Sequence, residues 1–346
     1  MLHTTHPTLI KVWLWSGIGL ISLMIAIGGI TRLTGSGLSI VEWKLISGTL
    51  PPLNQTEWQQ AFESYKQFPE YQKINFAMSL QDFKGIFWWE YIHRFLGRLI
   101  GLVFLLPFVY FLWRCMLSRL LIRRLLLILL VGALQGGMGW LMVKSGLVEL
   151  PHVSHYRLAA HLSLALLLIG LLLWTLEDLK PRPAAASRSG RFYPLAGLLL
   201  VLISMQIILG AFVAGLKSGF SYNTFPLMGD QWLPAHAFSA PMDLLENGVL
   251  VQFIHRWFAF GVLAVALGLA YSLRKATSSA PLQTLASWLL LVLGVQIVLG
   301  ILTLLLQVPL LLGVLHQMMA VLLFGLAVVL LYQVRAANRG MARGAL

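Results

Sequence analysis

The sequence predicts an all-α integral membrane protein: eight transmembrane helices in two tandem four-helix bundles, related by a pseudo-twofold axis along the membrane normal. The first observation is composition, since 58% of the residues are hydrophobic and only 11% are charged, against about a quarter charged in soluble domains. The second is eight apolar segments, each long enough, at about 20 residues, to cross a bilayer as a helix. The third is an internal repeat, which relates the two halves of the chain.

The eight expected spans are read off the apolar segments in chain order. The first, 12–31, is long and lacks a small-residue cleavage site, so we interpret it as a retained span and not as a signal peptide. No Arg- and Ser-rich transit sequence precedes it, which favours a bacterial inner membrane. The other spans are expected at 91–113, 121–143, 156–176, 193–213, 251–273, 283–306 and 310–333.

Basic residues gather at one set of helix ends, and this sets the topology. More than half of the 25 Lys and Arg residues follow the even-numbered spans or lie near the termini, with only Glu177 and Asp178 among the acids. The positive-inside rule makes this side and both termini cytoplasmic, so that the loops 32–90 and 214–250 face the periplasm. Topology accounts for the net charge of +13, and no nucleic-acid partner is expected. The basic residues of this side are Lys11, Arg114, Arg119, Arg123, Arg124, Lys180, Arg182, Arg188, Arg191, Arg274, Lys275, Arg335, Arg339 and Arg343.

Cysteine usage excludes several kinds of site. Cys115 is the only cysteine, so the chain has no intrachain disulfide, no Cys-x-x-Cys-His haem attachment and no cysteine-bound cluster. We interpret Cys115 as an inert thiol near a cytoplasmic helix end.

The repeat pairs polar residues of the two halves. The run 89–94 opens the second span as 251–256 opens the sixth, and His161 in the fourth span matches His316 in the eighth. Because each half holds an even number of helices, both halves enter the membrane in the same orientation. We expect an N-terminal half at 1–179, a cytoplasmic linker at 180–192 and a C-terminal half at 193–346.

Four of the nine histidines lie within spans, one on each even-numbered span. Ionisable residues inside a membrane are rare and mark function, and their occurrence in repeat-related pairs argues against an isolated interhelical hydrogen bond. Each half thus offers two histidines in the outer leaflet: His93 with His161, and His255 with His316. The other five are expected to be solvated, although His152-x-x-His155 is a weak metal-binding motif; they are His3, His6, His152, His155 and His236.

A small residue follows each intramembrane histidine by four positions, on the same helix face. It leaves a flat lane beside the imidazole, which suits a porphyrin, whereas zinc requires closer to four ligands. Histidine is a common axial ligand of haem iron, and bundle cores are where such cofactors are held. The pattern therefore predicts two bis-histidine haem sites. The small residues are Gly97, Ala165, Ala259 and Ala320.

Arginines adjoin the histidines and are candidates for binding the haem propionates. Arg94 and Arg256 directly follow their histidines, and Arg157 precedes His161 by one turn. Guanidinium groups bind carboxylates bidentately. Snorkelling to lipid headgroups is the competing interpretation, and it fits Arg98 about equally well.

Longer motifs resemble the haem A synthase family of the proteobacterial and mitochondrial type. The resemblance covers nearly the whole chain, but the cysteine pair that another branch carries in its first outer loop is missing. The motifs are Gly28-Gly29-Ile30-Thr31-Arg32-Leu33-Thr34, Ser36-Gly37-Leu38-Ser39-Ile40, Glu42-Trp43-Lys44, Pro51-Pro52, Phe83-Lys84, Glu90-x-x-His93-Arg94-x-x-Gly97-Arg98, Tyr222-Asn223-Thr224-Phe225-Pro226-Leu227-Met228, Glu246-Asn247 and Gln252-Phe253-x-His255-Arg256.

The resemblance implies an oxidoreductase for terminal oxidase assembly, which oxidises a methyl group of haem O to the formyl group of haem A with oxygen from water. It places the substrate haem on His93 and His161, and a resident haem b on His255 and His316. Implied partners are membrane lipid, a haem O synthase as donor, an unidentified electron acceptor and terminal oxidase assembly factors; a homo-oligomer is left open.

One repeat position differs in chemistry. Glu90 precedes His93 by three residues, while its counterpart before His255 is Gln252. At this spacing each side chain shares a helix face with its histidine, but only a carboxylate can accept a proton. We therefore predict that the first half is the reaction site and Glu90 its proton acceptor. The alternative is that Glu90 simply pairs with Arg94 one turn later.

Two other function classes are open to this pattern. A bis-haem b-type cytochrome for electron transfer would use the same ligands without altering the macrocycle. A transporter would show matched helix interruptions in its repeats, but Gly-rich 135–139 matches 296–300, which is not Gly-rich. The intramembrane Gln135, Gln206 and Gln296 are interpreted as interhelical hydrogen-bonding residues.

The first outer loop contains an amphipathic segment. Thr56 is the expected helix N-cap, and Trp58, Phe62 and Tyr65 share one face. The segment is expected either to cover the first haem site as a lid or to seal the bundle.

Overall fold

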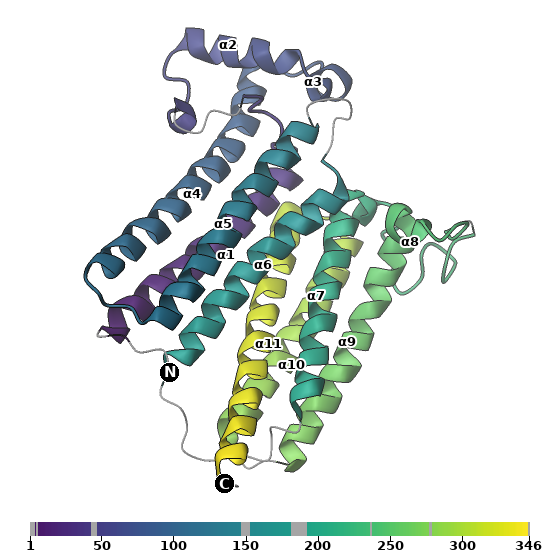
Figure 1. The fold of residues 1–346 in the computed structure, drawn as a ribbon. Helices are drawn as coiled ribbons and strands as arrows, with labels where there is room; N and C mark the ends of the chain where they lie inside the picture. The colour runs from purple at the N-terminus through teal and green to yellow at the C-terminus, as the bar shows by residue number, and fades with distance from the viewer. Residues whose placement is uncertain are drawn as a thin grey trace.

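The computed structural model describes residues 4, 6–42, 47–146, 153–180, 192–235, 237–276 and 279–344. Within this part of the chain, secondary structure is helical apart from two isolated bridges, and eight helices are long and apolar enough to span a membrane (Figure 1). They confirm the predicted class. The eight are α1 (Pro7–Leu33), α4 (Leu80–Trp113), α5 (Arg119–Gly146), α6 (His155–Asp178), α7 (Tyr193–Gly215), α9 (Gly248–Ala276), α10 (Ala280–Leu305) and α11 (Leu310–Gly344).

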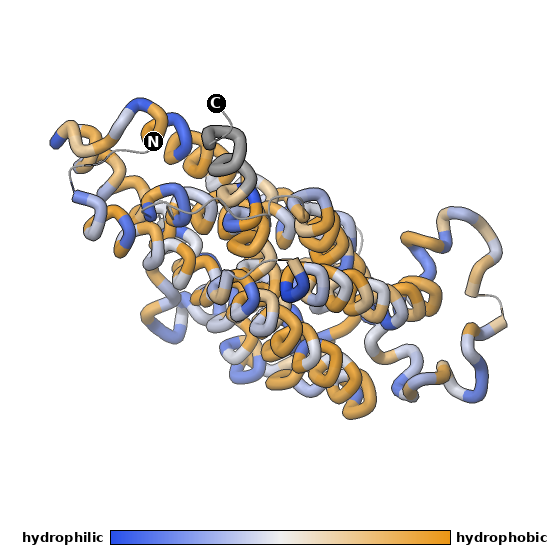
Figure 2. The backbone as a smooth tube through the Cα atoms, turned by 90° about the horizontal axis from the view of Figure 1, so that it is seen from below, coloured by the Kyte–Doolittle hydropathy of each residue, from blue (hydrophilic) through white to orange (hydrophobic). Residues whose placement is uncertain are grey.

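The bundle has two ends of different character. The start of α1 and the end of α11 lie at one end, and the short helices α2 (Gln55–Lys66), α3 (Pro69–Lys73) and α8 (Asp243–Glu246) lie at the other (Figure 1). Figure 2 shows the spans mostly hydrophobic, with many of the hydrophilic segments at helix ends and in loops. Large side chains such as Leu106 and Leu130 are more than half exposed along the spans, as a lipid-facing surface requires.

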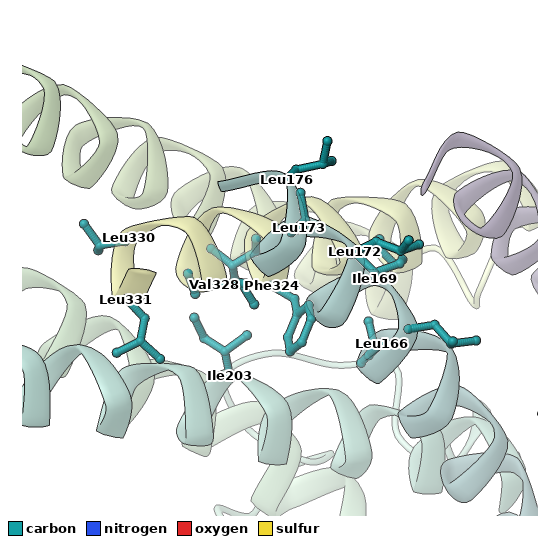
Figure 3. Close-up of a cluster of buried hydrophobic side chains, with 14 of the residues drawn as sticks. Leu166, Ile169, Leu172, Leu173, Leu176, Ile203, Phe324, Val328, Leu330 and Leu331 are labelled. Atoms are coloured by element: carbon teal, nitrogen blue, oxygen red, sulfur yellow. The ribbon is translucent and has the colours of Figure 1, made fainter. Parts of the chain in front are cut away.

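The core between the halves is made by α6, α7 and α11. Figure 3 shows Leu166, Ile169 and Leu172 of α6 beside Phe324 of α11, with Ile203 of α7 against them. Phe324 lies 3.6 Å from the position that a Cβ at Gly170 would take, so this glycine lets the ring approach α6 closely.

The same helix contacts recur in both halves. In the first half α1 packs on α4 and α6, and α5 packs on α4 and α6; in the second, α7 packs on α9 and α11, and α10 packs on α9 and α11. Across the interface, α1 contacts α11 and α6 contacts α7. This pairing is the one that tandem bundles with a twofold relation would have; the axis itself stays a prediction. Most of the expected linker, 181–191, lies outside the described residues.

Polar contacts join the halves at three levels. At the end opposite the termini, Arg32 Nη1 of α1 donates to the carbonyl of Ala214 in α7 over 2.9 Å. Deeper, Gln317 Nε2 of α11 donates to the carbonyl of Ile25 in α1 over 2.8 Å. At the end that holds the termini, the Tyr332 hydroxyl of α11 donates to Asp178 of α6 over 2.6 Å. Because unsatisfied backbone and side-chain groups are costly in lipid, these contacts fix how the halves meet.

One helix starts well before its expected position. α4 begins at Leu80 and not near residue 91, with a reciprocal capping box between Ser79 and Asp82. The apolar length predicts only the part inside the hydrocarbon, whereas the capping box and the aromatic residues Phe83 and Phe87 extend the helix outward. His93 therefore lies more than three turns inside the helix.

We call α2, α3 and the first turns of α4 the outer cap, which lies at the end of the bundle opposite the two termini. The N-cap residue of helix α2 is Asn54, whose side chain accepts a hydrogen bond from the Glu57 backbone N–H over 2.9 Å. The predicted N-cap, Thr56, is wrong, because it is Asn54 that has the extended backbone conformation of an N-cap residue. The expected apolar face is confirmed, since all three aromatic residues are buried and pack with aromatic residues of α4. These residues are Trp58, Phe62, Tyr65, Phe83 and Phe87.

The outer cap also buries a carboxyl group. The Tyr65 hydroxyl donates to Glu70 Oε2 over 3.1 Å, and Asn75 donates to that hydroxyl over 2.7 Å. Burial raises the pKa of Glu70 to about 7. This network ties α3 to α2 at the outer end of the molecule.

Candidate functional site

The two intramembrane histidines of the second half face each other. The ring centroids of His255 in α9 and His316 in α11 are 6.4 Å apart, with an interplanar angle of 81°. Two axial metal–nitrogen bonds of about 2 Å, plus about 1 Å from each nitrogen to its ring centre, put two imidazoles on one iron about 6 Å apart. The observed separation therefore fits a bis-histidine haem.

The first half pairs its histidines from the equivalent helices. His93 lies in α4 and His161 in α6, and both of these helices pack on α1. Both rings are partly buried. The two pairs thus occupy corresponding helices of the two halves, as the repeat predicts.

Each of the four histidine rings lies against a glycine of a neighbouring helix. A Cβ at Gly300 would stand 2.9 Å from His316 Cε1, and one at Gly210 would stand 3.1 Å from His255 Cε1. In the first half, a Cβ at Gly139 would stand 3.3 Å from His161 Cε1, and one at Gly28 would stand 3.1 Å from His93 Nε2. A Cβ at Gly300 would force the ring of His316 to shift, and a Cβ at each of the other three positions would make a tighter contact than is usual. Sequence reasoning missed these four glycines, which we call the glycine seats of the histidine rings. Three of them, Gly139, Gly210 and Gly300, end a Gln-x-x-x-Gly run.

Three of the histidines also contact the glutamine of that run. Gln206 Nε2 lies 3.2 Å from His255 Nδ1 and donates to the His255 carbonyl over 2.9 Å. Gln135 Nε2 lies 3.4 Å from His161 Nε2, and Gln296 Nε2 lies 3.5 Å from His316 Nε2. These amides do join helices, as interpreted from the sequence, but the groups that they join to are the candidate haem ligands.

Two of the small residues that follow the histidines lie close to other side chains. The position of a Cβ at Gly97 is 3.3 Å from the Met24 methyl group, and Ala165 is buried in the main core. A flat space for a porphyrin beside these residues stays a prediction.

Glu90 is buried, 3% exposed, and holds the loop that follows α1. Its Oε2 accepts from the Ser39 hydroxyl over 2.7 Å and from the Ile40 backbone over 2.8 Å. Its Oε1 pairs with Arg94 over 2.6 Å. Arg94 also donates to the carbonyls of Ile40 and Glu42, over 2.6 and 3.0 Å. The pairing with Arg94 that the sequence left open is therefore present, and the proton-acceptor role stays a prediction.

The second half fastens its corresponding loop with an amide and an arginine. Gln252 is 2% exposed and donates to the carbonyl of Tyr222 over 3.1 Å. Arg256 donates to Tyr222 and Thr224, over 2.6 and 2.8 Å. Both Arg94 and Arg256 thus bind loop carbonyls here, and their propionate-binding role stays a prediction, as does that of Arg157.

Of the histidines expected to be solvated, His155 is a correction. It opens α6, is 8% exposed, and lies edge-on to Phe212 with ring centroids 5.1 Å apart. It is buried because α6 packs on α7 at this point, where a Cβ at Gly215 would be 2.5 Å from the His155 Cβ. His3, His152 and His236 lie outside the described residues. Among the residues described, no group of three or more His, Cys, Asp or Glu side chains is placed to hold a metal ion.

Known proteins resemble the chain over nearly its whole length. Residues 11–328 match the family model described as cytochrome oxidase assembly protein, COX15-CtaA. A protein of Bradyrhizobium sp. (strain ORS 278) named heme A synthase is 48% identical over 330 residues, which cover 94% of this chain and 91% of that protein. Proteins of the same name from Rhodospirillum centenum and Nitrosospira multiformis are each 46% identical over 333 residues, covering 95% and 94% of this chain and 89% and 93% of those proteins.

The resemblance seen in the motifs is confirmed by these matches. Bacterial relatives and eight apolar helices fit a multi-pass protein of the bacterial inner membrane. The chain belongs to the COX15-CtaA family of cytochrome oxidase assembly proteins.

Proposed function

We propose that the chain is a haem A synthase, which converts haem O to haem A. The observation that carries this function is a facing histidine pair at haem spacing, His255 and His316, in a chain whose relatives bear that name over more than 90% of its length. The relatives do not favour the alternative of a cytochrome for electron transfer only.

The reaction replaces a methyl group by a formyl group. One water enters, and four protons and four electrons leave: R–CH₃ + H₂O gives R–CHO + 4 H⁺ + 4 e⁻. The oxygen of the formyl group is that of the water, and the electrons pass to an acceptor outside this chain. A protein that performs this reaction must therefore position the methyl group and accept protons close to it.

We assign the reaction to the first half. His93 and His161 hold the iron of the substrate haem there, and Glu90 stands one turn before His93 as the acid–base group. Glu90 accepts protons that leave the methyl carbon and the water. It is held in place by Ser39 and Arg94, and its carboxylate is screened from bulk water by burial.

We assign a resident haem b to the second half, on His255 and His316. When bound there, it supplies one-electron redox chemistry. Gln252 in place of a carboxylate gives this half no proton acceptor at the matching position, which fits a site where the macrocycle is not altered. Propionates of the two haems are proposed to bind Arg94, Arg157 and Arg256, and Arg94 and Arg256 combine this role with holding their loops.

The membrane setting follows from charge. Both termini are proposed to be cytoplasmic, with the haem sites towards the periplasm. A haem O synthase as donor and terminal oxidase assembly factors as recipients are the proposed partners.

The test is to express the chain with and without a haem O synthase, and to identify the extracted haems chromatographically. Haem A should appear only with the synthase, and its formyl oxygen should carry label from H₂¹⁸O. A preparation with two unmodified b haems and no haem A would instead identify an electron-transfer cytochrome.

A further inference from the structure

The four glycine seats share a second feature, one helical turn before the glycine. Counting back four residues from Gly139, Gly210 and Gly300 gives Gln135, Gln206 and Gln296, whose amides contact the histidine rings. Four residues before Gly28 the chain has Met24. Three of the four candidate ligands therefore have an amide beside the ring, and the fourth position carries a thioether.

The glutamine amides are placed where a metal-bound imidazole needs them. An imidazole that gives one nitrogen to iron carries its proton on the other, and this N–H requires an acceptor. The Oε1 atoms of all three glutamines are buried without a hydrogen-bond partner in the described structure. The amides lie beside Nδ1 of His255 but beside Nε2 of His161 and His316. In these last two rings the other nitrogen, Nδ1, is buried without a partner. An amide offers both a donor and an acceptor at one place, so rotation of each side chain can supply that acceptor.

Met24 offers the ring of His93 much less. A thioether donates no hydrogen bond and accepts only weakly. The Met24 methyl group lies instead against Gly97, four residues after His93, at 3.3 Å from the Cβ position. His93 thus has the glycine seat of the other three ligands but not their amide.

We propose that Gln135, Gln206 and Gln296 are positioning residues that orient the axial histidines, and that Met24 leaves His93 as the releasable ligand. The second half then has two oriented ligands and retains its haem. The first half has one oriented ligand, His161, and one ligand that dissociates from the iron more readily, His93. A site whose haem enters as substrate and leaves as product requires such a ligand. This inference rests on the proposed function, since it assumes that the four histidines bind haem iron.

The first experiment removes an amide from the second half. In purified protein, Gln206→Met and Gln296→Met should each lower haem b affinity about 10- to 100-fold, the usual effect of losing an outer-shell partner. The midpoint potential of the remaining haem b should rise, because a ligand without an acceptor for its N–H is less basic and stabilises ferric iron less. Gln296→Glu, which keeps an acceptor oxygen, should retain the haem.

The matched control is Gln317→Met. This glutamine is also intramembrane, but its amide donates to the α1 backbone at Ile25. Its loss should leave the potential and the affinity of haem b unchanged. Gln206→Met and Gln296→Met variants with haem affinity and potential equal to those of Gln317→Met would overturn the inference.

The second experiment adds an amide beside His93, so its result does not depend on whether the protein folds after an amide has been removed. Met24→Gln should slow release of the haem from the first half about 10-fold or more, with the haem b spectrum unchanged. The readout is transfer of haem O or haem A from purified protein to excess apomyoglobin. Release at the wild-type rate would contradict the role given to Met24.

Failure of the inference and failure of the proposed function give different results. If His255→Ala or His316→Ala keeps a normal low-spin haem b, the ligand assignment itself is wrong. If those variants lose haem b while Gln206→Met and Gln296→Met do not weaken it, the ligands are right and the positioning role is wrong.

Discussion

Glu90 and Gln252 occupy the same place in the two halves but differ in what they can do with a proton. Both side chains are buried. Glu90 holds the loop after α1 through Ser39 and Ile40, and Gln252 holds the loop after α7 through Tyr222. Since an amide performs the loop-holding role in the second half, that role does not by itself require a carboxylate in the first. The acid at this position is therefore attributed to chemistry.

The variant Glu90→Gln separates the two roles. It imitates the second half, so it should fold, keep haem b and bind haem O, yet make less than a tenth as much haem A, since loss of a general base costs about 10²–10⁴-fold in rate. Product haems are quantified by chromatography. Truncation to Ala would be a poorer test, because it would also remove the acceptor that holds Ser39 and Ile40 and leave buried donors unsatisfied.

The matched control is Gln252→Glu, which adds a carboxylate to the second half and should not raise haem A yield. Haem A production near the wild-type level by Glu90→Gln would leave Glu90 as the structural partner of Arg94.

The sequence predicts which residues are candidates for the site better than it predicts which residues they contact. The four histidines and Glu90 stand out because charge and imidazole are costly in a membrane, and spacing along one helix says which of them share a face. The partners of Glu90 on the loop, Ser39 and Ile40, are 51 and 50 residues away in the sequence. No helical period encodes such a contact.

At the scale of helices, each candidate haem ligand depends on a close approach between its own helix and a neighbouring helix that carries a glycine. Helix α11 brings His316 against Gly300 of α10, and α9 brings His255 against Gly210 of α7. Glycine at these places removes the side chain that would hold the ring away from the neighbouring helix.

Gly300→Ala is therefore expected to disturb haem binding in the second half. Its new Cβ would stand 2.9 Å from His316 Cε1, so the ring must shift, and the low-spin haem b content of purified protein should fall at least several-fold. Gly294→Ala, on the same helix with open space around it, should keep full haem content. Equal haem content in both variants would show that the seat does not position His316.

The outer cap gives a prediction about pH. Burial raises the pKa of Glu70 to about 7 from its usual 4.5. Between these values the folded cap keeps a proton that the opened cap has released, so the stability of the cap should fall as pH rises through this window, by about 3 kcal/mol at most.

Hydrogen exchange measures this dependence directly. Protection factors of α2 amides should decrease from pH 4.5 to 7, and Glu70→Gln should remove most of that slope. Glu63→Gln changes an exposed carboxylate of the same cap and should retain the slope. An unchanged slope in Glu70→Gln would show that another group governs the cap.

The positions of the helices could be predicted within the hydrocarbon, where apolar length determines them, but not for the helix ends that lie outside it. Eight spans follow from apolar length alone, and all eight are present. The apolar pattern puts the start of α4 11 residues too late, and the N-cap of α2 is Asn54 and not Thr56. Both helix ends lie outside the apolar spans and are set by Ser79, Asn54 and aromatic packing.

At the scale of the molecule, two halves of the same helix order are proposed to perform different tasks. Contacts across their interface, such as Arg32 to Ala214 and Tyr332 to Asp178, join them into one body at both ends. The repeat in the sequence predicts the two histidine pairs, but identical ligands cannot tell which half holds substrate. The assignment rests on Glu90 and Met24, which differ in chemistry from their counterparts in the second half, the amides Gln252 and Gln206.

The most direct test of this division is the haem content of half-specific ligand variants, purified from cells that also make haem O. The account predicts that His93→Ala and His161→Ala retain one haem b per chain and yield no haem A. It predicts that His255→Ala and His316→Ala lose that haem b. Loss of the resident haem b from the first-half variants, with a normal low-spin haem b in the second-half variants, would contradict the account.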